Sequence, residues 1–253
     1  MAGIEAIIMA GGRGTRLHPY TAVLPKPLMP LGDAPVLELL LRQLRSHGVR
    51  QVCLAVNHLH HLIRAFFGDG SSLGLQIHYT LEDRPLGTCG PVGAVLDQMQ
   101  DDFLLLNGDL LTDMDFSLLL ARHRARKADL TVASVRRVTR IEYGVLDMDE
   151  DGQLLSVHEK PAMEHLISMG VYALRRDALL PHVGPRQPLD MPDLINTMMR
   201  RGARVDCHPT DCCWLDIGRP DDYAAAQRLV SESRPTIMQA GASAEPILTT
   251  AQR

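Results

Sequence analysis

Residues 4–32 read "IEAIIMAGGRGTRLHPYTAVLPKPLMPLG", a short apolar run followed by a loop rich in glycine, proline and positive charge. The apolar run, residues 4–10, is typical of a strand that is buried on both faces of a parallel sheet. Glycine has no side chain, so the loop presents bare backbone N–H groups where a phosphate can approach closely. We therefore expect a βα unit that opens an α/β fold and carries an anion-binding site.

Three cations in this loop support the same prediction. Arg13 and Arg16 offer guanidinium groups to a polyphosphate, and Lys26 offers an ammonium group. The prolines at positions 19, 25, 27 and 30 stiffen the loop and reduce the entropy lost on binding. The Walker A pattern is absent, and a dinucleotide fingerprint would need glycine where Leu17 stands. A glycine- and proline-rich surface loop without a ligand is the alternative.

Apolar runs and helical patterns alternate through the first half, which predicts a mostly parallel, doubly wound sheet. Strands are expected at residues 51–56, 75–80 and 103–106, and helices at 37–44, 59–67, 93–98 and 116–126. The second half is richer in strand patterns, with a turn at Asp151 and Gly152. It also predicts strands at 205–208 and 213–217 and helices at 191–201 and 221–229. Residues 233–253 show no periodicity and are expected to form a disordered tail.

The composition narrows the class of protein. The 253 residues carry 26 basic and 30 acidic side chains, a net charge of −4, so no global field favours nucleic acid or an anionic membrane. No apolar run approaches the roughly 20 residues that span a bilayer, and no signal-peptide pattern is present, so a cytoplasmic location is expected. Five cysteines without framework spacing are expected to be free thiols.

Residues 11–35 resemble the opening signature of the sugar-1-phosphate nucleotidyltransferases, the NDP-sugar pyrophosphorylases, in a short single-domain form. The resemblance continues in order with "PLGTCG" from Pro85, "NGD" from Asn107, "EKP" from Glu159, "MGVY" from Met169 and "WLDIGRPDDY" from Trp214. It implies a Rossmann-like, doubly wound mixed sheet, the nucleotide-diphospho-sugar transferase fold, with a smaller β-rich sugar-binding region. It also implies that a nucleoside triphosphate and a sugar 1-phosphate give an NDP-sugar and pyrophosphate.

By this resemblance, residues 1–232 form one nucleotidyltransferase domain. Residues 1–128 are expected to bind mainly nucleotide, and residues 129–218 to bind mainly sugar and supply the second metal ligand. The implied partners are these two substrates, with neither nucleic acid nor a membrane, and with a homo-oligomer as an open expectation. The resemblance includes no hexapeptide-repeat extension after Leu229.

The family's site residues carry over onto matching positions. The nucleotide-binding set is Ala10, Gly11, Gly12, Arg13, Gly14, Thr15, Arg16, Lys26, Glu82, Gly87, Thr88 and Gly108. The sugar-phosphate set is Gly144, Glu159, Lys160, Ser168 and Gly170. The catalytic set is Arg16, Lys26 and Asp109, and the expected ligands of Mg²⁺ are Asp109 and Asp216.

Each assignment has a simpler alternative. Asp109 fits a plain turn, Asp216 fits a helix cap, and Glu159 with Lys160 fits a solvated ion pair. Histidines in "NHLHH" do not share one helix face, and "CHPTDCC" lacks a C-x-x-C pair, so neither segment predicts a metal site.

Glu82 bears on the choice of nucleotide. It stands where thymidylyltransferases of the family carry a glutamine that contacts the pyrimidine. A carboxylate only accepts hydrogen bonds, so it suits the paired donors of guanine and repels O4 of thymine or uracil. This favours GTP, with mannose 1-phosphate or a related hexose or heptose phosphate as acceptor. Thymidylyl transfer to glucose 1-phosphate is one alternative, and a catalytically silent sugar-nucleotide-binding regulator is another. Ser168 replaces an asparagine common in the family, which leaves the sugar undetermined.

Overall fold

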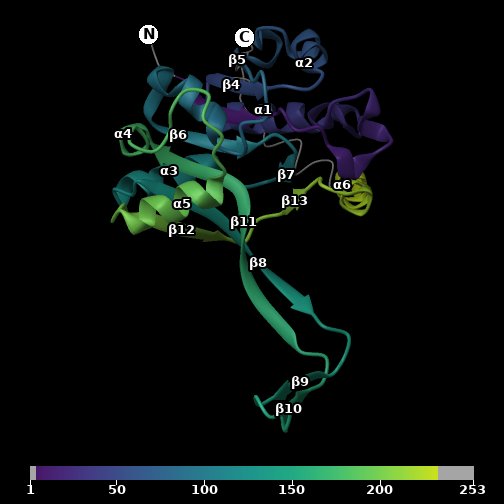
Figure 1. The fold of residues 1–253 in the computed structure, drawn as a ribbon. Helices are drawn as coiled ribbons and strands as arrows, with labels where there is room; N and C mark the ends of the chain where they lie inside the picture. Colours follow the sequence, from purple (N-terminus) through teal and green to yellow (C-terminus); the bar gives the residue numbers. More distant parts are fainter. Residues whose placement is uncertain (1–3, 233–253) are drawn as a thin grey trace, which may run out of the picture.

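The computed structural model describes residues 4–232, in which a seven-stranded mixed sheet is flanked by helices (Figure 1). The strands lie in the order β12 (Val205–Thr210), β8 (Leu130–Arg140), β11 (Ala162–Arg175), β6 (Met99–Asn107), β1 (Ile4–Met9), β4 (Gln51–Val56) and β5 (Gln76–Leu81). β11 runs antiparallel to β6 and β8, and the other neighbouring strands are parallel. The expected mixed α/β sheet is confirmed.

Shorter elements surround this sheet. Three two-stranded ladders pair β7 (Leu110–Thr112) with β13 (Trp214–Asp216), β9 (Val145–Met148) with β10 (Leu154–His158), and β2 (Pro30–Leu31) with β3 (Ala34–Pro35). The α-helices are α1 (Val36–Ser46), α2 (His60–Phe67), α3 (Phe116–Ala125), α4 (Arg176–Leu179), α5 (Met191–Arg200) and α6 (Pro220–Glu232). No helix within residues 4–232 is long and apolar enough to cross a bilayer.

The helix expected at residues 93–98 is wrong. The chain forms two 3-10 turns instead, η5 (Gly90–Ala94) and η6 (Leu96–Gln98). Close packing explains the difference, since a Cβ at Gly93 would lie 2.3 Å from the carbonyl oxygen of Gly184. Gly90, Pro91 and Gly93 also lower the helix propensity of this segment.

Alternate residues of the central strands build two separate cores. Ile8 of β1 packs in a cluster with leucines of α1 and with Phe116 of α3. Its neighbour Ile7 faces the other side of the sheet, among Leu194 and Met198 of α5. The apolar strand β1 is therefore buried on both faces, as its sequence predicts.

A third core attaches the opening loop to the C-terminal helix. Leu17 of the loop is fully buried and clusters with Ile217 and with Ala226 and Val230 of α6. Short 3-10 turns, η1 (Thr15–Leu17), η2 (Tyr20–Ala22) and η3 (Lys26–Leu28), shape the rest of the loop. This packing fixes the loop against α6. The glycine-rich edge of the loop faces the carboxyl ends of the strands.

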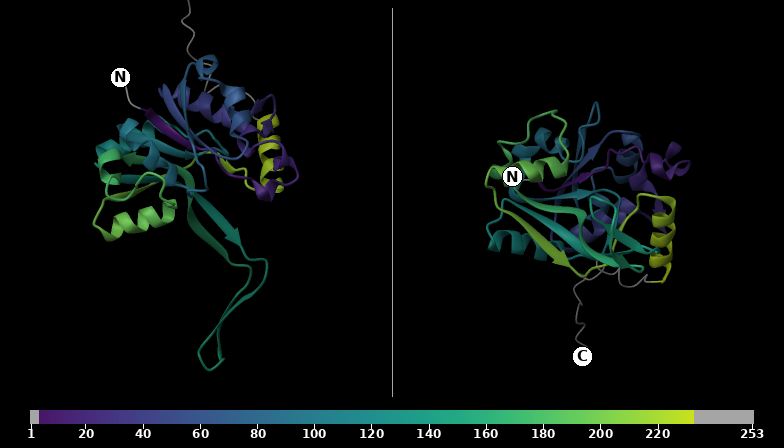
Figure 2. Two further views of the ribbon diagram at one scale, coloured as in Figure 1. Left: turned by 45° about the horizontal axis from the view of Figure 1, so that its top comes forward. Right: turned by 60° about the horizontal axis from the view of Figure 1, so that its bottom comes forward.

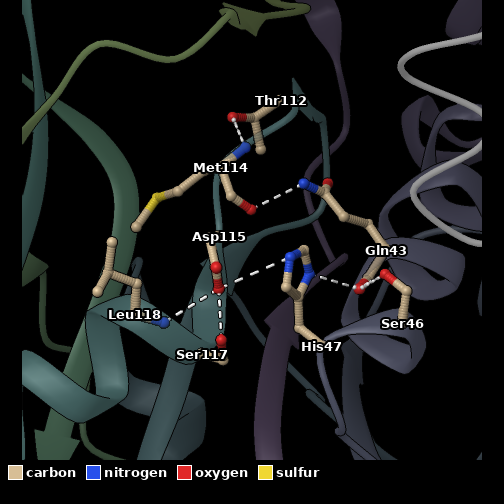
Figure 3. Close-up of polar contacts among 8 residues, drawn as sticks. All are labelled: Gln43, Ser46, His47, Thr112, Met114, Asp115, Ser117 and Leu118. Carbon is tan, nitrogen blue, oxygen red and sulfur yellow. Dashed lines mark hydrogen bonds and ion pairs between the residues drawn. The ribbon is translucent and has the colours of Figure 1, made fainter.

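Polar contacts brace the segment that follows β7 (Figure 3). The Gln43 side chain donates a hydrogen bond from Nε2 to the Met114 carbonyl at 2.9 Å. Asp115 caps α3 by accepting from the Leu118 N–H at 3.0 Å, and its carboxylate lies 3.7 Å from Nε2 of His47. These contacts connect the end of α1 to the start of α3 beside β7, the strand that follows Asp109.

A long ribbon, which we call the arm, projects from the sheet at residues 136–167 (Figures 1 and 2). It comprises the outer halves of β8 and β11 and the β9–β10 hairpin. The expected turn at Asp151 and Gly152 is confirmed at its tip, where the Gly152 N–H bonds to the Asp149 carbonyl at 3.1 Å. None of residues 136–167 is buried.

Candidate active site

A cleft of about 500 Å³ opens at the carboxyl ends of β1, β4 and β6. This edge is where ligands bind in open α/β sheets. The strands end at Met9, at Val56 just before Asn57, and at Asn107. Residues from five segments line it: Met9–Arg13 with Arg16, Lys26 and Pro27; Asn57; Glu82–Thr88; Asn107 with Asp109; and Asp216.

One short ladder brings the two expected metal ligands together. Asp109 follows β6, and β7 begins at the next residue. β13 pairs antiparallel with β7, with Asp216 opposite Leu110, and the Ile217 N–H bonds to the Asp109 carbonyl at 3.0 Å. Acids from distant parts of the sequence thus meet at one lip of the cleft.

Lys26 lies between these two acids. Its ammonium group forms a short ion pair with Oδ2 of Asp109 and lies 3.8 Å from Oδ1 of Asp216. The lysine side chain is only 11% exposed. Burial and the neighbouring Asp109 raise the pKa of Asp216, while the charges of Lys26 and Arg16 oppose that rise.

The carboxylates fit a divalent cation on chemical grounds. Oδ1 of Asp109 and Oδ1 of Asp216 are both buried without a hydrogen-bond partner, so each has a free lone pair at this lip. Mg²⁺ binds oxygen ligands and is often held by one or two carboxylates together with substrate phosphates. No set of three or more His, Cys, Asp or Glu side chains in the described range is placed to hold a metal ion. An ion here would therefore depend on the two aspartates and on phosphate oxygens.

The glycine-rich edge of the cleft has specific steric causes. Gly11 packs against Glu82 and Asn57, and a Cβ there would lie 2.7 Å from Oε1 of Glu82. Gly14 adopts φ +62°, a left-handed conformation in which a Cβ would also clash with Thr21. Gly12 is exposed, with nothing within 4 Å of its Cβ position. Its open backbone is available to a ligand.

Two exposed arginines flank this edge. Arg13 and Arg16 both line the cleft, and neither forms a hydrogen bond or salt bridge with another residue of the range 4–232. Their guanidinium groups can bind an anion, and the charge of Arg16 also acts on the nearby Asp216 carboxyl group, whose pKa it lowers. Among the other predicted nucleotide residues, Ala10 lines the cleft, whereas Gly14, Thr15 and Gly108 lie beside it without lining it. Gly108 closes the strand end by donating its N–H to the Met9 carbonyl at 2.9 Å.

Glu82 is buried at the back of the cleft. Its Oε2 accepts a hydrogen bond from the Leu86 N–H at 3.1 Å, which closes the 82–88 segment, and its Oε1 abuts Gly11. Burial raises the pKa of this carboxyl group, and the Leu86 bond partly opposes the rise. Glu82 therefore stabilises the conformation of the 82–88 segment and also faces the cleft.

Gly87 and Thr88 line the cleft, but each also contacts the segment before α5. The Gly87 backbone has φ +78°, and a Cβ there would lie 2.7 Å from both Oδ1 of Asp190 and the Leu189 carbonyl. The Thr88 N–H and hydroxyl both donate to Oδ1 of Asp190, and the hydroxyl accepts from the Met191 N–H. Asp190 could not be predicted, because a loop contact across about a hundred residues leaves no local pattern in the sequence.

The predicted sugar-phosphate residues do not line this cleft. Ser168 and Gly170 lie on β11, where a Cβ at Gly170 would lie 2.4 Å from Nδ2 of Asn107. Gly144 directly precedes β9, and Glu159 and Lys160 directly follow β10, so all three belong to the arm, which projects away from the sheet (Figure 1). Gly144 and Glu159 are close neighbours there, with 3.2 Å between a Gly144 Cβ and Oε2 of Glu159. Their role in sugar binding stays a prediction.

A second recess of about 540 Å³ adjoins the cleft and shares Arg16 and Asp216 with it. Three further arginines contribute to its lining, and so does Trp214, the single tryptophan of the chain. Trp214 is fixed by a hydrogen bond from its Nε1 to the Met169 carbonyl at 2.9 Å. The other lining residues are Val135, Arg136, Arg137, Cys212, Leu215, Gly218, Arg219 and Asp222.

Sequence reasoning missed several cleft residues. Asn57 follows β4 and Asn107 ends β6 at the same sheet edge as Asp109, so their positions at the ends of apolar strands were the available signal. Asp83 and Arg84 follow Glu82 in the cleft wall. All five cysteines are free, as expected, and burial raises the pKa of the Cys53 and Cys89 thiols to about 12.

The model of one protein family, the nucleotidyl transferases, matches residues 5–233. The chain belongs to this family. It is 32% identical over 244 residues to a UTP–glucose-1-phosphate uridylyltransferase of Synechocystis, covering 89% of this chain and 63% of that enzyme. It is 30% identical over 221 residues to the D-glycero-alpha-D-manno-heptose 1-phosphate guanylyltransferase of Campylobacter jejuni, covering 87% of this chain and 97% of the relative.

The fold is also similar to that of a solved structure. The crystal structure of HddC from Yersinia pseudotuberculosis superposes with a TM-score of 0.70 at 24% identity, covering 89% of this chain and 98% of HddC. At that identity the similarity establishes the fold alone. The chain spans 63% of the length of the Synechocystis relative and nearly all of the Campylobacter relative.

Proposed function

We propose that the chain transfers a nucleotidyl group from a nucleoside triphosphate to a sugar 1-phosphate and releases pyrophosphate. The observation that carries this proposal is the position of Lys26, held between Asp109 and Asp216 at the mouth of a glycine-lined cleft. Transfer at a phosphorus atom depends on positioning and charge neutralisation more than on a protein nucleophile. The described groups supply both.

In the proposed reaction, a phosphate oxygen of the sugar 1-phosphate forms a bond to the α-phosphorus. The bond from that phosphorus to the bridging oxygen of the β-phosphate breaks, and its electron pair leaves with pyrophosphate. Lys26 stabilises charge that develops at the α-phosphate, while Arg13 and Arg16 hold the departing pyrophosphate. The attacking oxygen is already ionised, so the step needs no general base.

Mg²⁺ is part of this proposal, with Asp109 and Asp216 as its protein ligands. The unpartnered carboxylate oxygens support it. When bound, the ion supplies positive charge that neutralises phosphate oxygens of both substrates. Lys26 would then give up part of its contact with the acids and turn its ammonium group toward the α-phosphate.

For the nucleotide we propose GTP. Glu82 presents an acceptor-only carboxylate in the cleft wall, which suits paired donors on a base edge. The Campylobacter relative is named a guanylyltransferase, which agrees with GTP, whereas the Synechocystis relative is named for UTP. Mannose 1-phosphate or a related hexose or heptose phosphate remains the proposed acceptor, and thymidylyl transfer to glucose 1-phosphate remains the alternative.

The second recess is the proposed seat of the acceptor. It adjoins the cleft at Asp216, and Arg137 and Arg219 in its lining have no salt-bridge partner in the part of the chain described here. A sugar phosphate bound there would lie beside Trp214, whose fluorescence would report its arrival. A cytoplasmic location belongs to the same proposal.

The test is a matrix of four nucleoside triphosphates against a panel of sugar 1-phosphates, with Mg²⁺ present and pyrophosphate release as the readout. Turnover with GTP and a manno-configured phosphate supports the proposal in full. Turnover with dTTP and glucose 1-phosphate supports the family reaction and replaces the substrate pair. If no pair turns over while nucleotides still bind, the regulator hypothesis replaces the enzyme.

A further inference from the structure

Asp190 stands at the start of α5, but its carboxylate bonds to the wall of the cleft and not to its own helix. Aspartate is favoured at this position because its side chain can accept from a free N–H of the first helical turn. The Asp190 side chain makes no such bond. Its Oδ1 accepts instead from the Thr88 N–H at 2.9 Å and from the Thr88 hydroxyl at 3.2 Å. The Thr88 hydroxyl in turn accepts from the first N–H of the helix, that of Met191, at 2.9 Å. Thr88 therefore caps α5, and Asp190 holds Thr88.

The backbone on both sides of Thr88 is bonded to Leu189. The Leu189 carbonyl accepts from the N–H groups of residues 89 and 90, at 2.9 and 3.0 Å, and the Leu189 N–H donates to the Leu86 carbonyl at 2.9 Å. These bonds do not involve the Asp190 side chain, so they remain when that side chain is removed. The Asp190 carboxylate is thus the side-chain contact that orients Thr88 between them.

Gly87, which precedes Thr88 in the cleft wall, packs against the same carboxylate. It has φ +78°, and a Cβ at this position would lie 2.7 Å from Oδ1 of Asp190. The bare backbone of the glycine therefore lies directly against the acid. Gly87 and Thr88 both line the cleft, so Asp190 sets the shape of this part of its wall.

The charge of Asp190 acts in the opposite direction from its hydrogen bonds. A nucleoside triphosphate is a polyanion, and a carboxylate directly behind the wall of its cleft repels it. Asp190 is exposed and forms no salt bridge with any residue of the range 4–232. Its charge alone would therefore weaken nucleotide binding, whereas its bonds to Thr88 would strengthen it. The sign of the effect on affinity distinguishes the two roles.

We propose that Asp190 is a positioning residue for the nucleotide. It acts through Thr88 and Gly87 and keeps this part of the wall in the conformation that binds the triphosphate. Asp190 does not itself line the cleft, so it acts without touching the ligand. The inference rests on the proposed function, in which residues 82–88 contact the nucleotide. It gives the second half of the chain, which was expected to bind mainly sugar, a part in setting nucleotide affinity.

The first experiment measures affinity for GTP, or for dTTP if the substrate matrix selects it, by titration calorimetry with Mg²⁺ and without acceptor. Asp190→Ala should bind the nucleotide about tenfold more weakly, because Thr88 loses the acceptor that orients it. Asp190→Asn should stay within about twofold of wild type, since its amide oxygen still accepts from Thr88. The matched control is Asp193→Ala, which removes an acid from the first turn of the same helix and should leave the affinity unchanged.

The second experiment separates positioning from a general loss of structure. In Asp190→Ala the KM for the triphosphate should rise about tenfold, while kcat and the KM for the sugar phosphate stay within about twofold of wild type. Hydrogen exchange followed by mass spectrometry should become faster in the peptide that contains Thr88 and stay unchanged in β1 and β6. Circular dichroism should be unchanged, because Thr88 still caps α5 in this variant.

Three results would overturn the inference. Affinity of Asp190→Ala equal to or above that of wild type would leave charge as the only effect of the carboxylate. An Asp190→Asn variant as impaired as Asp190→Ala would show that its hydrogen bonds do not matter. An equal rise in the KM of both substrates would indicate a general structural role.

Failure of the proposed function gives a different result. A wild-type chain that binds nucleotide but turns over no sugar phosphate contradicts that function alone, and the calorimetry still decides the role of Asp190. A wild-type chain that binds no triphosphate contradicts both.

Discussion

Oδ1 of Asp216 lies 3.8 Å from Nζ of Lys26, and the same ammonium group binds Asp109. One lysine of the opening loop thus contacts two carboxylates, one that follows β6 and one at the end of β13. The ammonium group of Lys26 lies where the phosphate chain of a nucleotide would bind. The carboxylates of Asp109 and Asp216 lie beside it, where they could bind a divalent ion.

Replacing Lys26 with alanine should lower kcat/KM for pyrophosphate release by roughly 100- to 1,000-fold, because charge developing at the α-phosphate loses its nearest cation. Steady-state kinetics on the best substrate pair measures the loss. Lys127→Gln is the matched control, since Lys127 is an exposed lysine at the end of α3. Activity of Lys26→Ala near the wild-type level would remove this residue from the mechanism.

Replacing Asp216 with asparagine should stabilise the metal-free protein while abolishing turnover. The pKa of Asp216 is raised in the folded state, so the folded chain is destabilised, relative to a neutral side chain, once the pH exceeds that raised value. The gain in Tm should be full near pH 7 and should shrink as the pH falls toward the ordinary aspartate value of 3.8. Thermal melts in EDTA measure it, with the exposed Asp211→Asn as control. An equal Tm for Asp216→Asn and wild type at neutral pH would contradict the account.

Replacing Glu82 with glutamine should change nucleotide preference while preserving the loop. The glutamine oxygen can still accept from the Leu86 N–H, but the new amide can donate to a pyrimidine carbonyl. The ratio of kcat/KM for GTP to that for dTTP should fall by about tenfold or more. Asp83→Asn removes a neighbouring charge of the same cleft wall and serves as control. A similar fall in that control would assign the effect to general electrostatics.

His123 should make stability depend on pH. It is fully buried, with Nδ1 2.8 Å from the Thr131 hydroxyl, and burial lowers its pKa despite the nearby Asp102. In the unfolded chain His123 binds a proton near pH 6.5, whereas in the folded chain it stays neutral to lower pH. The free energy of unfolding therefore falls as the pH drops below about 6.5. Urea titrations between pH 8 and 5 should show a smaller decline for His123→Gln than for wild type. Parallel curves would show that another histidine causes the decline.

Replacing Asp115 with alanine should cost about 1 kcal/mol of stability through loss of the α3 cap. The same carboxylate contacts His47, so the junction in Figure 3 loses two contacts at once. Urea denaturation measures the change, and Ser117→Ala, which removes only the adjacent hydroxyl, should cost less. No loss in Asp115→Ala would show that the cap is dispensable.

Much of the fold could be predicted because the core strands are apolar and short. The expected strand at residues 51–56 coincides with β4, and the leucine spacing at 37–44 lies within α1, whose apolar face is buried against the sheet. The wrong helix at 93–98 had apolar residues at suitable positions, but Gly90 and Gly93 are packed against residues 184–187. Such tertiary contacts leave no periodic signal.

Some features of the candidate site could be predicted from the sequence and others could not, for the same reason. Glycines and cations near β1 lie in one continuous motif, so the loop from Gly11 to Lys26 and its place in the cleft followed from the sequence. The contact of Lys26 with both acids depends on the β7–β13 ladder, which pairs strands about a hundred residues apart. The projection of the arm could not be predicted either, because alternating residues indicate strands and say nothing of what covers them.

The most direct test of the central claim is a crystal structure of the chain with Mn²⁺ and a non-hydrolysable GTP analogue. The account predicts an anomalous peak between Asp109 and Asp216, with the triphosphate against the backbone of Gly11 and Gly12 and the guanidinium groups of Arg13 and Arg16. A manganese peak away from both acids, or a nucleotide bound outside this cleft, would contradict it.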